Sequence, residues 1–400
     1  MTWNLQLIIG PGGLTFDPPP LPLAYLSANV FNGELHVCYV SATPAINLPR
    51  ASCSIWDVWC NGATGQWSLL QLTGPGGLAS GSPLAWGFVT PATVTYNNQM
   101  HVCYSDDFGL IWDAWYNGAT GQWKLQQLAG PGGLSGGPPI GNVDPFAVTY
   151  NDQMHVCYSD INGVIWDAWY DGVRGVWNAQ QLTGSGGLTN GPTCNSLLSV
   201  VVYSNHMHVC YGDLNALVWD AWYDGATGQW NPQQLAGPGG LAGGPAAGSH
   251  NYTNTPAAVT YGDQMHVCYC DINGVIWDAW YDGARGVWNS QQLTGTGGRT
   301  NGPPCPGFTV SVVVYGDQMH VCYCDQNGVI WDAWYDGVRG VWSLQQLVGP
   351  VGLAGSLTAL WLEPVAVTYN NQMHVFYLGA TGSTDEGSPL WDAWYNPTGP

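Results

Sequence analysis

Basic side chains are the scarcest feature of this 400-residue sequence. Lys and Arg together number 6 against 26 Asp and Glu, so the formal net charge is −20, and charged residues of all kinds make up only 8% of the chain. Nucleic acids and anionic membrane surfaces are bound largely through neutralisation of phosphates, which requires a basic face. The composition argues against both, and a neutral or cationic partner fits better.

Long apolar segments are lacking as well. No run of about 18 apolar residues is present, so the sequence predicts no membrane-spanning helix. The first ten residues, MTWNLQLIIG, contain neither a basic segment nor a long apolar core, and they do not read as a signal peptide. We therefore expect a protein that is cytoplasmic or is released without a signal peptide. Helical periodicity is not sustained anywhere, which favours β-structure.

What the chain does contain is seven copies of one unit, typified by AVTYNDQMHVCYSDINGVIWDAWYDGVRGVWNAQQL from Ala147 to Leu182. Repetition of this kind takes precedence over the domain count that length alone suggests. The MHVCY segment recurs, with small changes, around His36, His101, His155, His208, His266, His320 and His374. The WDAW segment starts at Trp56, Trp112, Trp166, Trp219, Trp277, Trp331 and Trp391.

Each repeat contains four short segments rich in β-branched and aromatic residues, separated by turn sequences. Four antiparallel strands in a repeat of about 54 residues describe one blade of a β-propeller. The ends predict how the ring closes: residues 2–13 match a fourth strand with its loop, while the seventh copy stops after its third strand. We therefore expect a single all-β domain over residues 1–400, a seven-bladed propeller closed by the N-terminal strand.

Two blades depart from the pattern, because longer segments replace the tight hairpin turn at residues 41–54 and 378–389. Any site built from that turn should be altered in the first and seventh blades.

Twelve cysteines could suggest a disulfide framework, but six of them share one repeat position: Cys38, Cys103, Cys157, Cys210, Cys268 and Cys322. Phe376 occupies that position in the seventh copy, which indicates a buried apolar site and predicts core packing. The pairs Cys268/Cys270 and Cys322/Cys324 are weak candidates for zinc without a clustered His. Cys194 and Cys305 occupy equivalent loops, and the sequence assigns them no role.

Asn162-Gly163 predicts a two-residue hairpin turn between the second and third strands. With that turn, His155, Cys157, Trp166, Ala168 and Tyr170 should share one face of the blade, while Tyr158, Asp160, Asp167 and Trp169 share the other. Each groove between blades would then combine an aromatic surface with hydrogen-bonding groups, an arrangement that suits a pyranose. Trp169 itself is expected to pack in the core.

The candidate ligand residues of the third blade are a His, Tyr, Asp, Asn, Trp and Asp, in that order along the chain. With their counterparts in the regular blades, the set comprises His101, Tyr104, Asp106, Trp112, Asp113, His155, Tyr158, Asp160, Asn162, Trp166, Asp167, His208, Tyr211, Asp213, Trp219, Asp220, His266, Tyr269, Asp271, Asn273, Trp277, Asp278, His320, Tyr323, Asp325, Asn327, Trp331 and Asp332. A purely structural interpretation stays open, with Asp and His bonding each other to join neighbouring blades.

Catalysis fits the sequence poorly. No Ser or Cys nucleophile motif accompanies the His and Asp residues, and a hydrolase needs an acid and a base in different environments whereas every carboxylate here is repeated. Sialidase-like glycosidases also need converging arginines, but Arg174, Arg285 and Arg339 share one repeat position in different blades. The D-x-N-G turn lacks the further carboxylates of a calcium loop. We expect no catalytic residues, no metal and no cofactor.

A protein-interaction scaffold of the WD40 type remains the main alternative, although its period is only about 40–45 residues. The tandem units MHVCYSDINGVIWDAWYDGVRGVWNAQQLTGSGG resemble mushroom β-propeller lectins of the Agrocybe aegerita type, which are specific for terminal N-acetylglucosamine (GlcNAc). More distantly, the pattern is similar to bacterial seven-bladed fucose-binding lectins. The resemblance implies shallow sugar pockets between adjacent blades, without metal or catalysis. The expectation is a multivalent lectin that cross-links glycans ending in GlcNAc, with a homodimer left open.

Overall fold

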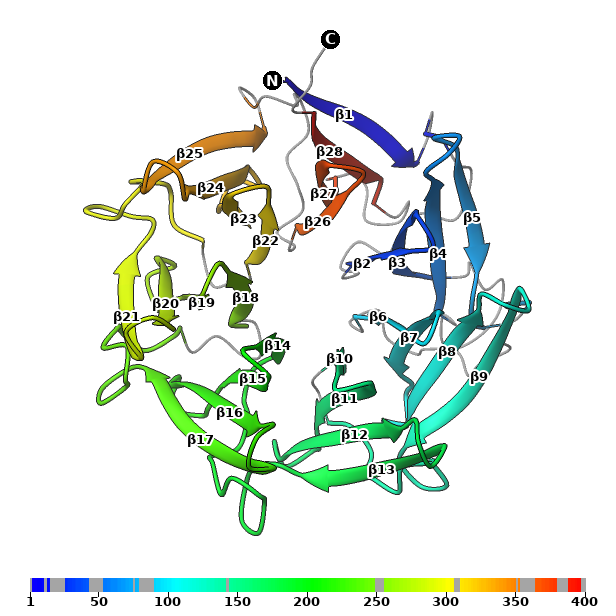
Figure 1. The fold of residues 1–400 in the computed structure, drawn as a ribbon. Coiled ribbons are helices and arrows are strands. Elements are labelled where there is room, and N and C mark those ends of the chain that lie inside the picture. Colours follow the sequence, from blue (N-terminus) through cyan, green and yellow to red (C-terminus); the bar gives the residue numbers. More distant parts are fainter. Residues whose placement is uncertain are drawn as a thin grey trace.

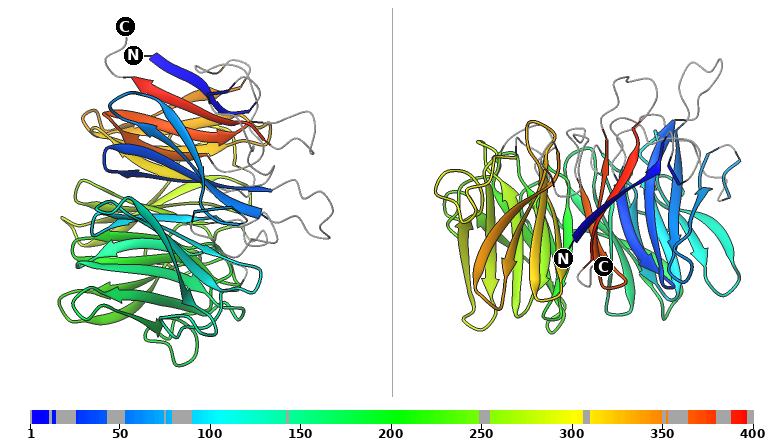
Figure 2. Two further views of the ribbon diagram at one scale, coloured as in Figure 1. Left: turned by 90° about the vertical axis from the view of Figure 1, so that its right-hand side faces the viewer. Right: turned by 90° about the horizontal axis from the view of Figure 1, so that it is seen from above.

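A computed structural model describes residues 2–10, 13–14, 26–42, 53–74, 76–78, 90–141, 144–248, 255–305, 310–349, 352, 364–379 and 388–396. These residues form seven four-stranded antiparallel sheets arranged as a ring of blades (Figure 1), which confirms the predicted propeller. Seen from the side, the ring is a thick disc whose two faces carry the turns (Figure 2). None of the described residues forms a helix that could cross a membrane.

The first four blades follow the chain from the innermost strand to the outermost. Blade 1 contains β2 (Leu26–Phe31), β3 (Glu34–Ala42), β4 (Cys53–Asn61) and β5 (Trp67–Gln71). Blade 2 contains β6 (Ala92–Tyr96), β7 (Gln99–Ser105), β8 (Ile111–Asn117) and β9 (Gln122–Ala129). Blade 3 contains β10 (Phe146–Tyr150), β11 (Gln153–Ser159), β12 (Ile165–Asp171) and β13 (Val176–Gln181). Blade 4 contains β14 (Ser199–Tyr203), β15 (His206–Gly212), β16 (Val218–Asp224) and β17 (Gln229–Ala236).

The remaining blades follow the same order until the last one. Blade 5 contains β18 (Ala257–Tyr261), β19 (Gln264–Cys270), β20 (Ile276–Asp282) and β21 (Val287–Gln292). Blade 6 contains β22 (Ser311–Tyr315), β23 (Gln318–Cys324), β24 (Ile330–Asp336) and β25 (Val341–Val348). Blade 7 contains β26 (Val365–Tyr369), β27 (Gln372–Leu378), β28 (Leu390–Asn396) and, from the other end of the chain, β1 (Thr2–Ile9).

The N-terminal strand closes the ring as the sequence predicted. β1 lies along the outer side of β28 (Figure 1) and pairs with it antiparallel from Thr2↔Asn396 to Ile9↔Leu390. Trp3 and Gln6 thereby take the places that Trp177 and Gln180 hold in blade 3, opposite the corresponding Tyr and Asp of the third strand. Closure leaves the ring without the open gap at which a sheet could pair with another chain.

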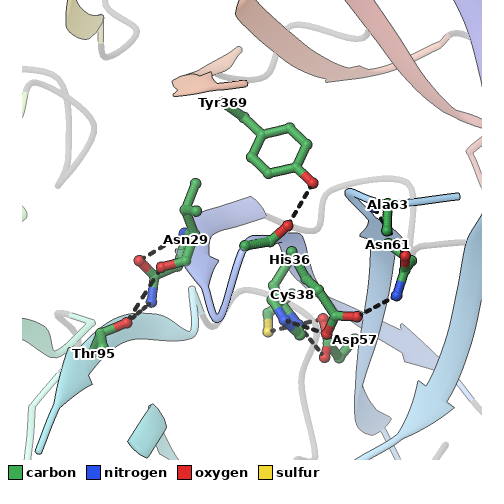
Figure 3. A network of polar contacts seen from close by, with 11 residues as sticks. Asn29, His36, Cys38, Asp57, Asn61, Ala63, Thr95 and Tyr369 are labelled. Atoms are coloured by element: carbon green, nitrogen blue, oxygen red, sulfur yellow. Dashed lines mark hydrogen bonds and ion pairs between the residues drawn. The ribbon is translucent and has the colours of Figure 1, made fainter. Parts of the chain in front are cut away.

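Neighbouring blades are joined by a repeated tyrosine near the axis. The last residue of the innermost strand donates its hydroxyl to a backbone carbonyl in the next blade, for example Tyr150 to Asn205 at 2.7 Å and Tyr369 to Gly33 at 2.8 Å. Blade 1 has Phe31 at this position and uses other contacts: Asn29 donates to Thr95 at 3.1 Å (Figure 3), and the Ser27 and Thr93 hydroxyls lie 2.7 Å apart.

The core of each blade is the second strand together with the middle of the third. In blade 3, Met154, Val156, Cys157, Tyr158 and Ala168 have no exposed surface. The six cysteines of the repeat are likewise buried, and so is Phe376 in their place, which confirms the core-packing prediction. Burial is the main cause that raises the pKa of these thiols well above its usual range, and the negative charge of the nearby repeat aspartate adds to it. The thiols therefore stay protonated.

The turn between the second and third strands is one residue longer than predicted. Asp160 pairs with Val164 around Ile161, Asn162 and Gly163, with Gly163 in the left-handed region at φ 72°. The carboxylate of Asp160 accepts the backbone N–H groups of Asn162 at 2.8 Å and Val164 at 3.1 Å. The aspartate of the motif therefore organises this turn.

The added residue shifts the register, so the predicted division of side chains between faces is wrong. His155 lies opposite Trp169 and Cys157 opposite Asp167, whereas Tyr158 lies opposite Trp166. Directly opposed residues share a face. His155, Cys157, Asp167 and Trp169 therefore lie on the face toward blade 4, and Tyr158, Trp166, Ala168 and Tyr170 lie on the other.

Cys194 and Cys305 gain a structural explanation. The backbone N–H of Cys194 donates to Gly163 at 2.7 Å, and that of Cys305 donates to Gly274 at 2.6 Å, so each fastens an inter-blade loop to a hairpin turn. The segments that replace this turn in blades 1 and 7 lie mostly outside the described residues.

Candidate functional site

Four hollows with volumes of about 430 to 570 Å³ lie between successive blades. We call them groove 2/3, groove 3/4, groove 4/5 and groove 5/6 after the blades that form them. Groove 3/4 is representative: its lining residues are Tyr150, Asn151, Gln153, His155, Trp169, Gln180, Leu188, Met207, Tyr223, Gly228, Gln229 and Trp230. The repeat thus builds similar hollows around the ring.

The wall supplied by the leading blade is polar and aromatic. His155 Nδ1 lies 3.0 Å from Asp167 Oδ2, and the same oxygen accepts the side-chain amide of Gln180 at 3.0 Å. In the equivalent position of groove 2/3, His101 stacks on Trp115 with ring centroids 6.0 Å apart and 18° between the planes. Asp167 is fully buried, so it orients the His and the Gln from behind the groove surface.

The hydrogen bond to Asp167 determines what the other ring nitrogen can do. A neutral imidazole that donates from Nδ1 has an acceptor at Nε2. In blades 1, 2, 3, 4, 6 and 7 this Nε2 is buried and has no hydrogen-bond partner among the described residues. In blade 5, His266 Nε2 lies 3.1 Å from Gln264 Oε1. Because the Nε2 of those six blades has no exposed surface, the histidine contributes its ring to the groove wall and does not offer a ligand an open acceptor.

The facing wall belongs to the next blade and is mainly aromatic. In groove 3/4, Tyr223 and Trp230 have ring centroids 5.5 Å apart, and Tyr223 meets Tyr150 of the leading blade edge-on at 6.0 Å. Met207 is fully buried beneath them. Each groove is therefore flanked by indoles from two blades, with carboxamide groups between them.

Figure 3 shows the same arrangement at blade 1. His36 lies against Asp57, with Nδ1 2.8 Å from Oδ2, and Cys38 lies beside the same carboxylate. Burial acts to lower the pKa of His36, but the charges of Asp57 and Glu34 and the hydrogen bond to Asp57 outweigh it and raise that pKa. Leu70 replaces the glutamine opposite Asp57, so this blade lacks the amide that the others present.

Of the predicted ligand residues, the structure places only the histidines at the grooves. His101, His155, His208 and His266 each line one, whereas His320 of blade 6 lines none of these four. The aspartates of the third strand (Asp113, Asp167, Asp220, Asp278 and Asp332) and the tyrosines of the second (Tyr104, Tyr158, Tyr211, Tyr269 and Tyr323) have no exposed surface. Burial is the main cause that raises the pKa of Tyr158 and its equivalents, with the repeat aspartates adding to it, so these phenols stay protonated.

The remaining candidates belong to the hairpin turn. Trp166 Nε1 donates to Asp160 Oδ2 at 3.3 Å, and the same contact joins Trp112 to Asp106, Trp219 to Asp213, Trp277 to Asp271 and Trp331 to Asp325 at 2.9 to 3.2 Å. Asn162, Asn273 and Asn327 sit inside this turn and donate backbone N–H groups to its aspartate. None of these side chains lines any of the four grooves.

Several groove residues were missed by the sequence interpretation. Trp169, predicted to be core, is half-buried and lines groove 3/4, as Trp115, Trp222 and Trp280 line theirs. Trp177, Trp230, Trp288 and Trp342 of the fourth strands form the facing walls. The second tryptophan of WDAW repeats in every blade, but a one-residue register error assigned it to the wrong face. The fourth-strand tryptophans repeat as well, and the sequence interpretation assigned them to no face.

In the described part of the chain, His, Cys, Asp and Glu side chains nowhere gather in groups of three or more that could hold a metal. The buried cysteines of the repeat are kept protonated, so they are not nucleophiles. What the grooves offer is shape, aromatic surface and hydrogen-bonding groups, repeated around the ring.

No family model matches the chain, and no curated protein matches it in sequence. Solved structures similar to it include the polysaccharide lyase Uly1, with TM-score 0.56 and 11% identity over 94% of this chain and 90% of that one. The fucose-specific lectin from Aleuria aurantia has TM-score 0.50 and 14% identity, covering 82% and 96%. AofleA from Arthrobotrys oligospora has TM-score 0.48 and 14% identity, covering 77% and 83%. At these identities the likeness shows the propeller fold alone, which serves a lyase as well as lectins.

Proposed function

We propose that this protein is a multivalent lectin that binds the terminal GlcNAc of glycans in the grooves between its blades. The observation that carries the proposal is the groove itself: indoles from two blades flank carboxamide groups and a histidine held by a buried carboxylate. A pyranose combines an apolar C–H patch with a rim of hydroxyls, so it matches such a surface. The choice of sugar rests on the resemblance of the repeat units to GlcNAc-specific mushroom propeller lectins.

The groove residues take distinct roles in this proposal. Trp169 and Trp230 contact the sugar ring, while Gln153 and Gln180 bond its hydroxyls. His155 contributes its ring to the same groove wall. Asp167, Tyr158, Asp160, Asn162 and Trp166 act from behind, because they hold the histidine, the core and the turn in place.

Repetition makes weak sites useful. A groove that covers only part of one sugar binds it weakly, but engagement of a second groove on the same glycan-bearing surface raises apparent affinity by about 10²–10⁴. The protein would therefore cross-link cells or glycoproteins without catalysing a reaction. Its formal charge of −20 favours neutral glycans over phosphate-rich partners.

Calorimetric titration with GlcNAc, in parallel with fucose and galactose, tests this function. We expect saturable heat with GlcNAc at several sites per chain, and weaker heat with the other two sugars. Stronger binding of fucose would overturn the sugar assignment while keeping the lectin. A folded protein that gives no heat with any sugar would instead favour an interaction scaffold, with the grooves filled by a protein partner.

A further inference from the structure

Groove 5/6 differs from grooves 2/3 and 3/4 by one cation. In the Gly-rich loop after the fourth strand, Leu134 lines groove 2/3 and Leu188 lines groove 3/4. The equivalent residue at groove 5/6 is Arg299. The loop backbone is unchanged, since Leu188 and Arg299 donate their N–H groups to Gln181 and Gln292 at 3.0 and 2.9 Å. The substitution therefore replaces an apolar side chain by a cation in one groove, while the loop backbone stays the same.

Arg299 is held in place at the groove wall. Its Nε donates to Gln291 Oε1 at 3.1 Å, and Gln291 in turn donates its amide to Asp278 Oδ2 at 2.9 Å. Asp278 also lies 3.0 Å from His266 Nδ1. The buried carboxylate that orients the histidine thus orients the arginine through the glutamine. A guanidinium fixed through Nε still presents its terminal N–H groups to a ligand.

Arg299 also lacks the charge partner that the comparable arginines have. Arg174, Arg285 and Arg339 each lie 3.6 to 3.7 Å from the aspartate three residues earlier. Within the described parts of the chain, no carboxylate lies within such reach of Arg299, and neither Asp nor Glu appears among the residues lining groove 5/6. The chain has a net charge of −20, yet the positive charge of Arg299 at this groove is not neutralised by a carboxylate.

We propose that groove 5/6 binds a sugar that carries an oxyanion, with Arg299 pairing with that group beside the aromatic walls. This inference rests on the proposed lectin function and assigns one of its grooves a different ligand class. A guanidinium pairs with the oxygens of carboxylates and of tetrahedral oxyanions through charge-assisted hydrogen bonds, often two at once. The net negative charge of the protein repels anions at long range, but salt screens it beyond about 10 Å, so a local cation decides binding.

Two reciprocal variants provide a matched test. Arg299→Leu restores the residue found in grooves 2/3 and 3/4. Leu188→Arg installs the cation at groove 3/4, where Gln180 already donates to Asp167 in the same way and leaves its Oε1 for the new side chain. Both positions are exposed, so neither change should alter folding. Each protein is titrated with glucuronic acid, methyl sialoside, 6-sulfo-GlcNAc and, as the neutral reference, GlcNAc.

The wild-type chain should bind about one equivalent of at least one anionic sugar with an affinity that falls as salt rises. Arg299→Leu should weaken that binding about tenfold or more, the usual effect of losing a hydrogen bond to a charged group. GlcNAc binding elsewhere should be unchanged. Leu188→Arg should add a second anionic equivalent, and the sugar that responds identifies whether a carboxylate or a sulfate is the natural group.

Two results distinguish a failure of this inference from a failure of the proposed lectin function. If GlcNAc binds but the anionic sugars bind equally to wild type and Arg299→Leu, or not at all, this inference is wrong and the lectin function stands. If no sugar of either kind binds to the folded protein, the proposed function itself has failed.

Discussion

His155 and Asp167 lie on opposite sides of one hairpin and point toward each other, with Nδ1 3.0 Å from Oδ2. The pair joins two strands of the same blade and does not bridge two blades. The same contact occurs in all seven blades, from His36 with Asp57 to His374 with Asp392. Its carboxylate is fully buried, so the contact fixes the groove wall from inside the sheet.

Asp167→Ala should therefore destabilise the protein strongly. The change leaves the His155 Nδ1–H and the Gln180 amide without their acceptor inside the blade, at a cost of about 2–5 kcal/mol in the free energy of unfolding. Urea denaturation followed by tryptophan fluorescence measures it. Gln180→Leu is the matched control, since blade 1 already has Leu70 opposite Asp57. It should cost about 1 kcal/mol, and an equal loss for both variants would contradict the role given to the carboxylate.

The hairpin turn makes a second prediction through a natural contrast between blades. Gly163 and Ala216 occupy the same turn position, at φ 72° and 59°. A left-handed residue with a Cβ is strained by about 1 kcal/mol relative to glycine. Ala216→Gly should accordingly stabilise the protein by about 0.5–1 kcal/mol. Gly163→Ala should destabilise it by more, because the new Cβ would meet the carbonyl of Cys194. Thermal unfolding of the two variants tests the pair, and shifts of the same sign would refute it.

This turn also marks the boundary of what the sequence could predict. Seven repeats, four strands in each and closure by β1 followed from spacing and composition, and the structure agrees. The sequence did not determine which side chains share a face of the blade, because Asn162-Gly163 is compatible with two turn lengths that differ by one residue. That difference moved Trp169 from the core to groove 3/4 and Asp167 beside His155. The backbone pairing of Asp160 with Val164 and the bonds of the Asp160 carboxylate to its own turn distinguish the two lengths, and both depend on three-dimensional placement.

Asp144 gives a third prediction, which concerns pH. Burial raises the pKa of this carboxyl to about 7, against the hydrogen bonds from Thr90, whose hydroxyl lies 2.6 Å from Oδ2. The folded state therefore binds a proton that the unfolded state has released above pH 4, and its stabilising effect is lost as pH rises through 7. From pH 5 to pH 8 the free energy of unfolding should fall by about 3 kcal/mol through this group.

Asp144→Asn should remove that dependence, because the amide keeps an acceptor for Thr90 and cannot titrate. Denaturation of both proteins at pH 5, 6, 7 and 8 isolates the contribution as a difference. At pH 8 the free energy of unfolding should be higher for the variant than for the wild type. This difference should be larger at pH 8 than at pH 5. Parallel pH profiles would show that Asp144 is ionised in the folded protein throughout.

The most direct measurement counts GlcNAc molecules per chain by native mass spectrometry, for the wild type, for Trp169→Ala and for Trp166→Phe. Trp169 lines groove 3/4, whereas Trp166 faces the other way and bonds Asp160. Trp169→Ala should bind fewer molecules, losing the site at groove 3/4, with the affinity of the remaining sites unchanged. Trp166→Phe should keep the full number. An unchanged count for Trp169→Ala, or loss of all binding from that single change, would contradict a lectin whose sites repeat in the grooves between blades.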